Sequence, residues 1–288
     1  MKKKLTLVLS AMMLLTGCGD ISHASITPVS REDGSGTRGA FVELFDIQEK
    51  DKNGEKMDMT TDLAEITNST AVMLLTVTGN KNAIGYISMG SMNDAVKTLE
   101  IDGVKATFEN IKNGTYKVAR PFNIATKADA SPAAQDFINY ILSEEGQAVV
   151  EESGYISEGN TGNYKPTSAK GNVVVSGSSS VAPVMEKIKE AYEAINHNVT
   201  IEMQQSDSTI GMNSLKEGMC DIGMASRQLK ESELAAGLIP TVIALDGIAV
   251  VVNHENPVDG VKSEEVKAIY MGEIDEWTEI PLEKEETE

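Results

Sequence analysis

The segment VSREDGSGTRGAF, residues 29–41, has the composition of an anion-binding loop. Gly34 and Gly36 allow the main chain to approach a ligand closely, while Ser35 and Thr37 supply hydroxyl donors. Arg31 adds a planar, permanently charged donor group. Taken alone, the same residues also fit a capped helix after a glycine turn. This loop by itself therefore does not decide between a binding site and a helix cap.

The flanking sequence predicts that this loop joins a strand to a helix. Residues 26–29 have the apolar character of a strand end, and Phe41, Leu44 and Phe45 recur at helical spacing within residues 37–45. Residues 30–36 then form the connection, and their N–H groups open the helix. A helix N-terminus carries unpaired donors and about half a positive charge, which favours an anion there.

Three more segments repeat this design of a strand followed by hydroxyl side chains. They are VVVSGSSSVAPVM (173–185), QQSDSTIGM (204–212) and DIGMASRQL (221–229). Loops at the carboxyl ends of strands in an open α/β sheet meet in one crevice, which is where such sheets bind ligands. The chain contains only four arginines, and Arg31, Arg38 and Arg227 lie in or beside these loops. We therefore expect a ligand crevice with these loops around it.

The arrangement of apolar residues predicts an α/β fold. β-Branched apolar runs at residues 173–175, 199–203, 221–224 and 241–252 indicate strands. Helical spacing between two of them is shown by Val181, Val184, Met185, Ile188, Tyr192 and Ile195. Such alternation is typical of α/β proteins, and 288 residues suffice for two lobes. The polar, turn-rich residues 159–170 predict a linker, and residues 282–288 a charged, solvated tail.

The N-terminal residues have the pattern expected of an export signal. Three lysines precede the short apolar run of residues 5–15, which is too short to span a bilayer. The following LTGC resembles a bacterial lipobox, and this resemblance implies cleavage before Cys18 and lipidation of its thiol. An ordinary signal peptide with an incidental cysteine is the alternative. Cys220 is then the other cysteine of the chain, and we expect it to be a buried, inert thiol.

The sequence lacks the residues that several classes of function require. A net charge of −19 argues against nucleic acid, whose binding depends on clustered Lys and Arg. No P-loop motif occurs, no cysteine and histidine cluster has zinc spacing, and we expect neither a metal nor a cofactor. A serine hydrolase needs a histidine partner, but His23, His197 and His254 all lie outside the loops. We expect no enzyme activity.

The segments SREDGSGTRGAF, GSSSVAPVM, DIGMASRQLK, NAIGYISMG and AIYMGEIDEWTEI together resemble the phosphate-binding lipoproteins of bacterial phosphate ABC transporters. The resemblance covers nearly the whole mature chain and implies the two-lobe, type 2 periplasmic-binding-protein fold. In that family the GSSS loop usually comes first, whereas here the DGSGT loop leads. The chain therefore resembles a circular permutant of the family.

This permuted order predicts the domain organisation. Residues 1–17 form the signal peptide and 18–25 the tether. Residues 26–118 with 251–288 form the lobe of the DGSGT loop, and residues 119–158 with 171–250 form the lobe of the GSSS loop. The chain is expected to cross between lobes near residues 117–121 and 249–253, which are extended and either apolar or marked by proline.

The resemblance also implies which residues bind phosphate. In one lobe they are Arg31, Asp33, Ser35, Gly36 and Thr37; in the other they are Ser179, Ser180, Ser208 and Ser226. Ser226 stands where some members carry an aspartate that accepts the ligand's proton. Discrimination against sulfate is then expected to rest on Asp33, paired with Arg31, with a contribution from Asp207.

The implied function is capture of inorganic phosphate by a lipid-anchored monomer on the extracytoplasmic face of the cell membrane, with delivery to the permease subunits of an ABC importer. Tyr270 and Trp277 are expected to pack within a lobe, although a contact with the transporter is the alternative. Other functions remain open at this point: a receptor for sulfate or another tetrahedral oxyanion, a surface or signalling protein on the same fold, and a phosphoester hydrolase.

The tether gives a first prediction. Cys18→Ser removes the thiol that the lipobox resemblance assigns to lipidation, so the variant should leave the membrane fraction or accumulate uncleaved, while the purified soluble form keeps its ligand affinity. Cell fractionation with a labelled fatty acid measures this. Lipid label still attached to the variant would contradict it.

Overall fold

The computed structural model describes residues 25–52 and 56–281. The signal peptide, Cys18, His23 and the tail 282–288 lie outside the described residues. Among those described, no helix has the length and apolar character needed to cross a bilayer.

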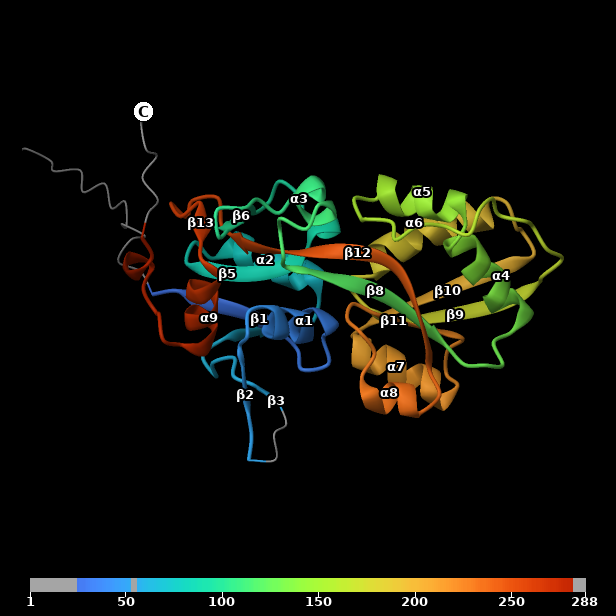
Figure 1. Cartoon of the computed structure of the whole chain (residues 1–288), viewed down its shortest axis with the longest axis horizontal. Coiled ribbons are helices and arrows are strands. Elements are labelled where there is room, and N and C mark those ends of the chain that lie inside the picture. The colour runs from blue at the N-terminus through green and yellow to red at the C-terminus, as the bar shows by residue number, and fades with distance from the viewer. Residues whose placement is uncertain (1–24, 53–55, 282–288) are drawn as a thin grey trace, which may run out of the picture.

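Strands and helices alternate as expected for an α/β protein (Figure 1). The strands are β1 (Thr27–Arg31), β2 (Gln48–Lys50), β3 (Lys56–Asp58), β4 (Glu65–Thr67), β5 (Ala83–Ser88), β6 (Lys97–Thr98), β7 (Glu100–Ile101), β8 (Ala119–Thr126), β9 (Gly171–Ser178), β10 (Val199–Ser206), β11 (Ile222–Ala225), β12 (Ile239–Val252) and β13 (Gly260–Val261). The α-helices are α1 (Gly36–Leu44), α2 (Thr70–Gly79), α3 (Phe108–Lys112), α4 (Pro132–Ile141), α5 (Glu144–Glu152), α6 (Ala182–Glu193), α7 (Ser208–Glu217), α8 (Glu231–Ala235) and α9 (Ser263–Met271). Short 3-10 helices are η2 (Met89–Ser91) and η3 (Trp277–Glu279).

One mixed sheet runs through the molecule in the order β10-β9-β11-β8-β12-β5-β1-β4, with β6 added beside β12. Strands β9, β10 and β11 are parallel to one another, whereas β8 and β12 are antiparallel to their neighbours. The predicted strands at 173–175, 199–203, 221–224 and 241–252 are confirmed as β9, β10, β11 and β12, each with slightly different ends.

Apolar side chains form two large cores along this sheet. One is built from residues between Ile26 and Val118 and between Ile248 and Ile280, with Ile156 added. The other draws on residues between Phe122 and Ala244. A smaller, separate cluster includes Met212 and Leu215 of α7. We refer to the parts around the two large cores as the first and the second lobe; the residue bounds predicted for the lobes stay a prediction.

Strands β8 and β12 connect the lobes and run side by side between them (Figure 1). The first half of β12 pairs with β8, and from Ile248 onward it pairs with β5 of the first lobe. Each strand thus belongs to both lobes. Two paired strands restrain twisting more than a single crossing does.

Tyr270 packs inside the first lobe, as expected. It is fully buried beside Phe41, with ring centroids 4.7 Å apart, and its hydroxyl donates to the carbonyls of Val29 and Ile84. Trp277 is also buried. The packing interpretation of both side chains is confirmed.

The predicted linker, residues 159–170, contains neither helix nor strand. It is nevertheless fastened to the second lobe, because Tyr164 and Thr167 donate hydrogen bonds of 2.8 and 2.7 Å to the buried Asp136 carboxylate. Burial alone would raise the pKa of Asp136, but hydrogen bonds from Tyr192 and these two residues hold it below its usual value. Asp136 is therefore a charged anchor that lies outside the four loops.

Candidate functional site

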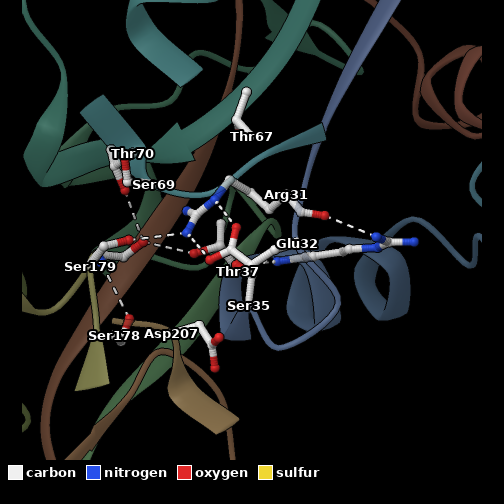
Figure 2. A network of polar contacts seen from close by, with 12 residues as sticks. Arg31, Glu32, Ser35, Thr37, Thr67, Ser69, Thr70, Ser178, Ser179 and Asp207 are labelled. Atoms are coloured by element: carbon white, nitrogen blue, oxygen red, sulfur yellow. Dashed lines mark hydrogen bonds and ion pairs between the residues drawn. The ribbon is translucent and has the colours of Figure 1, made fainter. Parts of the chain in front are cut away.

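The four hydroxyl-rich loops meet between the lobes, where their strands end. The loop after β1 comes from the first lobe, and the loops after β9, β10 and β11 come from the second. Figure 2 shows Arg31 and Thr37 of the first lobe facing Ser179 of the second. Helices α1, α6 and α7 begin directly after three of these loops, so their first N–H groups lie at the same place.

Arg31 places a guanidinium at the centre of this region. It ends β1, and only 2% of its surface is exposed. Its Nη2 donates to Ser179 Oγ across the lobe boundary at 3.1 Å. Tyr86 fixes the main chain at Arg31, because its hydroxyl accepts from the Arg31 backbone N–H. The same hydroxyl shares a 2.8 Å hydrogen bond with Ser30 Oγ.

Buried hydroxyls surround the guanidinium. Thr37 shares a hydrogen bond of 2.7 Å with Ser180, and each is 1% exposed. In the second lobe Ser178 donates to Ser226 Oγ at 2.9 Å, and the Ser226 N–H donates to Ser208 Oγ at 3.1 Å. Hydroxyls rotate freely to donate or accept, so each of these can redirect its proton toward an anion held between them.

Close backbone contact across the lobes depends on glycine. A Cβ at Gly36 would lie 2.4 Å from Ser208 Oγ and 2.7 Å from Ser226 Oγ. A Cβ at Gly34 would lie 2.5 Å from the Asp207 carboxylate, and the Thr209 N–H donates to the Gly34 carbonyl at 3.2 Å. The glycines therefore allow the two lobes to touch at the site.

Ser35 and Asp207 both act as helix caps. Ser35 Oγ accepts a hydrogen bond from the Arg38 N–H at the start of α1. Asp207 Oδ1 accepts one from the Ile210 N–H at the start of α7. The helix-cap alternative thus describes part of each loop correctly. It does not account for the hydroxyl contacts across the lobes.

The carboxylate that lies beside Arg31 is that of Glu32. Asp33 has a side chain that is 95% exposed, and it pairs with Arg38 at 2.7 Å. Glu32 instead accepts two hydrogen bonds from Arg31, of 2.8 and 2.7 Å. Asp33 turns outward, while the longer Glu32 side chain folds back onto the neighbouring guanidinium. The joint action of Arg31 and Asp33 on the ligand stays a prediction.

Neither of the other two loop arginines bonds to the hydroxyls around Arg31, although Arg227 Nη2 donates to Thr209 Oγ1 of the loop after β10 at 3.4 Å. Arg227 makes two hydrogen bonds of 2.8 Å to the Glu233 carboxylate. Arg38 bonds to Asp58 and Asp33, and also donates to the Arg31 carbonyl at 2.9 Å. Arg38 therefore holds the loop after β1 in place through the Arg31 carbonyl and the Asp33 carboxylate.

A fifth loop was missed by the sequence analysis. Thr70 begins α2, is 6% exposed, and shares a 3.3 Å hydrogen bond with Ser180 of the second lobe. Thr67, at the end of β4, donates to the Ser30 carbonyl at 3.0 Å, and Figure 2 shows it above Arg31. The segment ITNSTAV has the same order of strand end, hydroxyls and apolar helix as the other loops, and that signal could have revealed it.

The other groups considered for chemistry lie elsewhere. His197 and His254 are exposed, as expected. Cys220 is buried and free, and burial raises the pKa of its thiol to about 11, which fits the expected inert state. Within residues 25–52 and 56–281, no group of three or more His, Cys, Asp or Glu side chains could hold a metal ion.

Comparison with known proteins identifies the family. The model of the PBP superfamily domain matches residues 18–145 and 162–287. Phosphate-binding protein PstS 2 of Streptococcus agalactiae is 53% identical over 272 residues, which cover 93% of each chain. This chain belongs to the PstS family within the PBP superfamily.

Further PstS relatives agree in sequence and structure. The PstS 2 protein of Streptococcus pneumoniae is 44% identical over 97% of this chain and its own full length. The crystal structure of a phosphate-binding protein of a phosphate ABC transporter from Streptococcus pneumoniae has a TM-score of 0.70, with 90% of this chain and 100% of that chain covered at 44% identity. The expected fold is thus confirmed. The permuted segment order relative to other PstS proteins stays a prediction.

The ion pair between Arg31 and Glu32 can be tested by measuring the free energy of unfolding. Glu32→Gln leaves a buried guanidinium without its charged partner, so the free energy of unfolding should fall by about 1–3 kcal/mol. Asp33→Asn weakens only an exposed pair and should change it by less than about 0.5 kcal/mol. Urea unfolding of both variants measures the difference. A larger loss for Asp33→Asn than for Glu32→Gln would show that the wrong carboxylate has been assigned.

Proposed function

We propose that this chain is an extracytoplasmic receptor that captures inorganic phosphate between its lobes and delivers it to the permease of an ABC importer. The observation that carries the proposal is the buried Arg31 guanidinium, surrounded by hydroxyls from both lobes. The PstS relatives, named as phosphate-binding proteins and similar over nearly their whole length, support it.

The proposed contacts are side-chain and backbone donors in five loops. Arg31, Ser35, Gly36 and Thr37 act from the first lobe, with Thr70 added, and Ser179, Ser180, Ser208 and Ser226 act from the second. Hydrogen bonds to a charged ligand are roughly twice as strong as neutral ones. They must hold the anion locally, because the net charge of −19 opposes its approach.

Phosphate differs from sulfate by carrying a proton, and that proton needs an acceptor. Asp33 remains a predicted contact, but its side chain is exposed. Glu32 is the carboxylate that lies against the Arg31 guanidinium, so we propose Glu32 as the nearer acceptor. Hydroxyls such as Ser226 Oγ accept more weakly but do not repel a fully ionised anion. Sulfate is for this reason the main competing ligand.

The remaining parts of the proposal concern place and partners. Lipidation of Cys18 would anchor a monomer to the outer face of the cell membrane, where the permease subunits are reached directly. We propose a transport role without catalysis, which is supported by relatives named as binding proteins. The exposed histidines offer no base to a serine nucleophile.

Calorimetry tests this function directly. The purified protein should bind phosphate at micromolar or tighter dissociation constants, bind sulfate much more weakly, and leave a phosphomonoester unhydrolysed. The double variant Ser179→Ala/Ser180→Ala should lose at least about 100-fold in phosphate affinity, because two charge-assisted hydrogen bonds are removed. The exposed Ser232→Ala serves as the matched control and should bind normally.

Each other outcome supports one alternative. Preferential sulfate binding would identify an oxyanion receptor of another kind, and binding of neither anion would favour a surface or signalling protein. Turnover of the ester would indicate a hydrolase.

A further inference from the structure

The fourth arginine of the chain lies where the lobes are joined. Arg120 is on β8, directly opposite Asp246 on β12, and is 2% exposed. Both strands run between the lobes at this point (Figure 1). Asp246, at 1% exposure, is equally buried, so a full ion pair lies inside the connection.

The contacts of this pair reach into both lobes. Arg120 donates from Nε and Nη2 to Asp246 Oδ2 at 3.3 and 3.2 Å, and from Nη1 to the Ser226 carbonyl at 3.1 Å. The other oxygen of Asp246 accepts from Ser88 Oγ at 2.8 Å. Ser88 ends β5 of the first lobe, whereas Ser226 follows β11 of the second. A continuous series of hydrogen bonds therefore runs from the first lobe, through the connection, to a loop of the anion site.

We propose that Arg120 is a positioning residue of the anion site, which holds the Ser226 loop in its binding geometry through a guanidinium fixed by Asp246. This inference rests on the proposed phosphate function. Arg120 acts through Ser226, whose N–H donates to Ser208 Oγ and whose hydroxyl accepts from Ser178. A shift of the Ser226 carbonyl would displace both of these contacts.

Stability alone does not explain a charged pair at this position. Buried ion pairs seldom exceed well-packed apolar side chains in stabilising a fold, because both charges lose their hydration. The pKa values reflect this cost: burial raises the pKa of Asp246 to about 6 in spite of Arg120, and burial also lowers the pKa of Arg120. What a guanidinium adds is a fixed arrangement of donors, because its planar group reaches the Asp246 carboxylate and the Ser226 carbonyl at the same time.

The test is a double-mutant cycle with phosphate binding as the measurement. Arg120→Gln should weaken phosphate binding by about 10-fold or more in the wild-type background, but by a smaller factor when Ser226→Ala has already removed the hydroxyl that this loop presents. Equal effects in both backgrounds, or unchanged affinity in folded Arg120→Gln, would overturn the inference.

Arg120→Lys separates positioning from stability. A lysine ammonium can pair with Asp246 but lacks the planar fork that also reaches Ser226. This variant should recover the melting temperature lost in Arg120→Gln without recovering affinity; recovery of both would show a purely structural role. If Arg120→Gln does not fold, Arg120→Lys and Asp246→Asn still decide the question, since both must weaken binding.

Two controls complete the design. Asp136→Asn removes a buried carboxylate of the second lobe that fastens the linker, so it should lower the melting temperature but leave phosphate affinity within about twofold. A loss of affinity there similar to that of Asp246→Asn would count against a specific effect. The wild-type titration reports on the proposed function by itself: without phosphate binding both proposals fail, whereas normal binding with an unaffected Arg120→Gln rejects only this one.

Discussion

The placement of one buried guanidinium determines how the rest of the site is arranged. Arg31 carries a positive charge in a chain whose net charge is −19, and it lies between two lobes that both contribute hydroxyls around it. An unpaired charge at such a place is costly, so Glu32 accepts two of its hydrogen bonds and Ser179 a third. The guanidinium is thereby held rigid and aimed, which is the condition for recognising an anion by geometry.

The division of donors between lobes explains the architecture around them. Thr37 and Ser180 belong to different lobes and are in contact in this structure, and Gly36 leaves the space for that contact. Strands β8 and β12 join the lobes as two hydrogen-bonded strands. The Arg120–Asp246 pair lies in these same strands and contacts the Ser226 loop, so connection and site are physically continuous.

Much of this could be predicted from the sequence, since loops that join a strand to a helix carry a strong local signal. The strand ends, the glycines and the hydroxyls of four loops were found in this way. The contact between Glu32 and Arg31 was not predicted. The directions of the Glu32 and Asp33 side chains depend on the turn after β1 rather than on residue type. Arg120 lay within a predicted crossing but carried no motif; its role depends on pairing across strands 126 residues apart in sequence.

We propose that the lobes close around phosphate, and small-angle X-ray scattering measures this change most directly. Saturating phosphate should lower the radius of gyration of the wild-type protein. Gly36→Ala should abolish this change, because its Cβ would collide with Ser208 and Ser226, whereas Gly39→Ala on the same helix should preserve it, since its nearest neighbour would be Arg227 Cδ at 3.9 Å. Tight phosphate binding with an unchanged scattering curve in the wild type would contradict the two-lobe site.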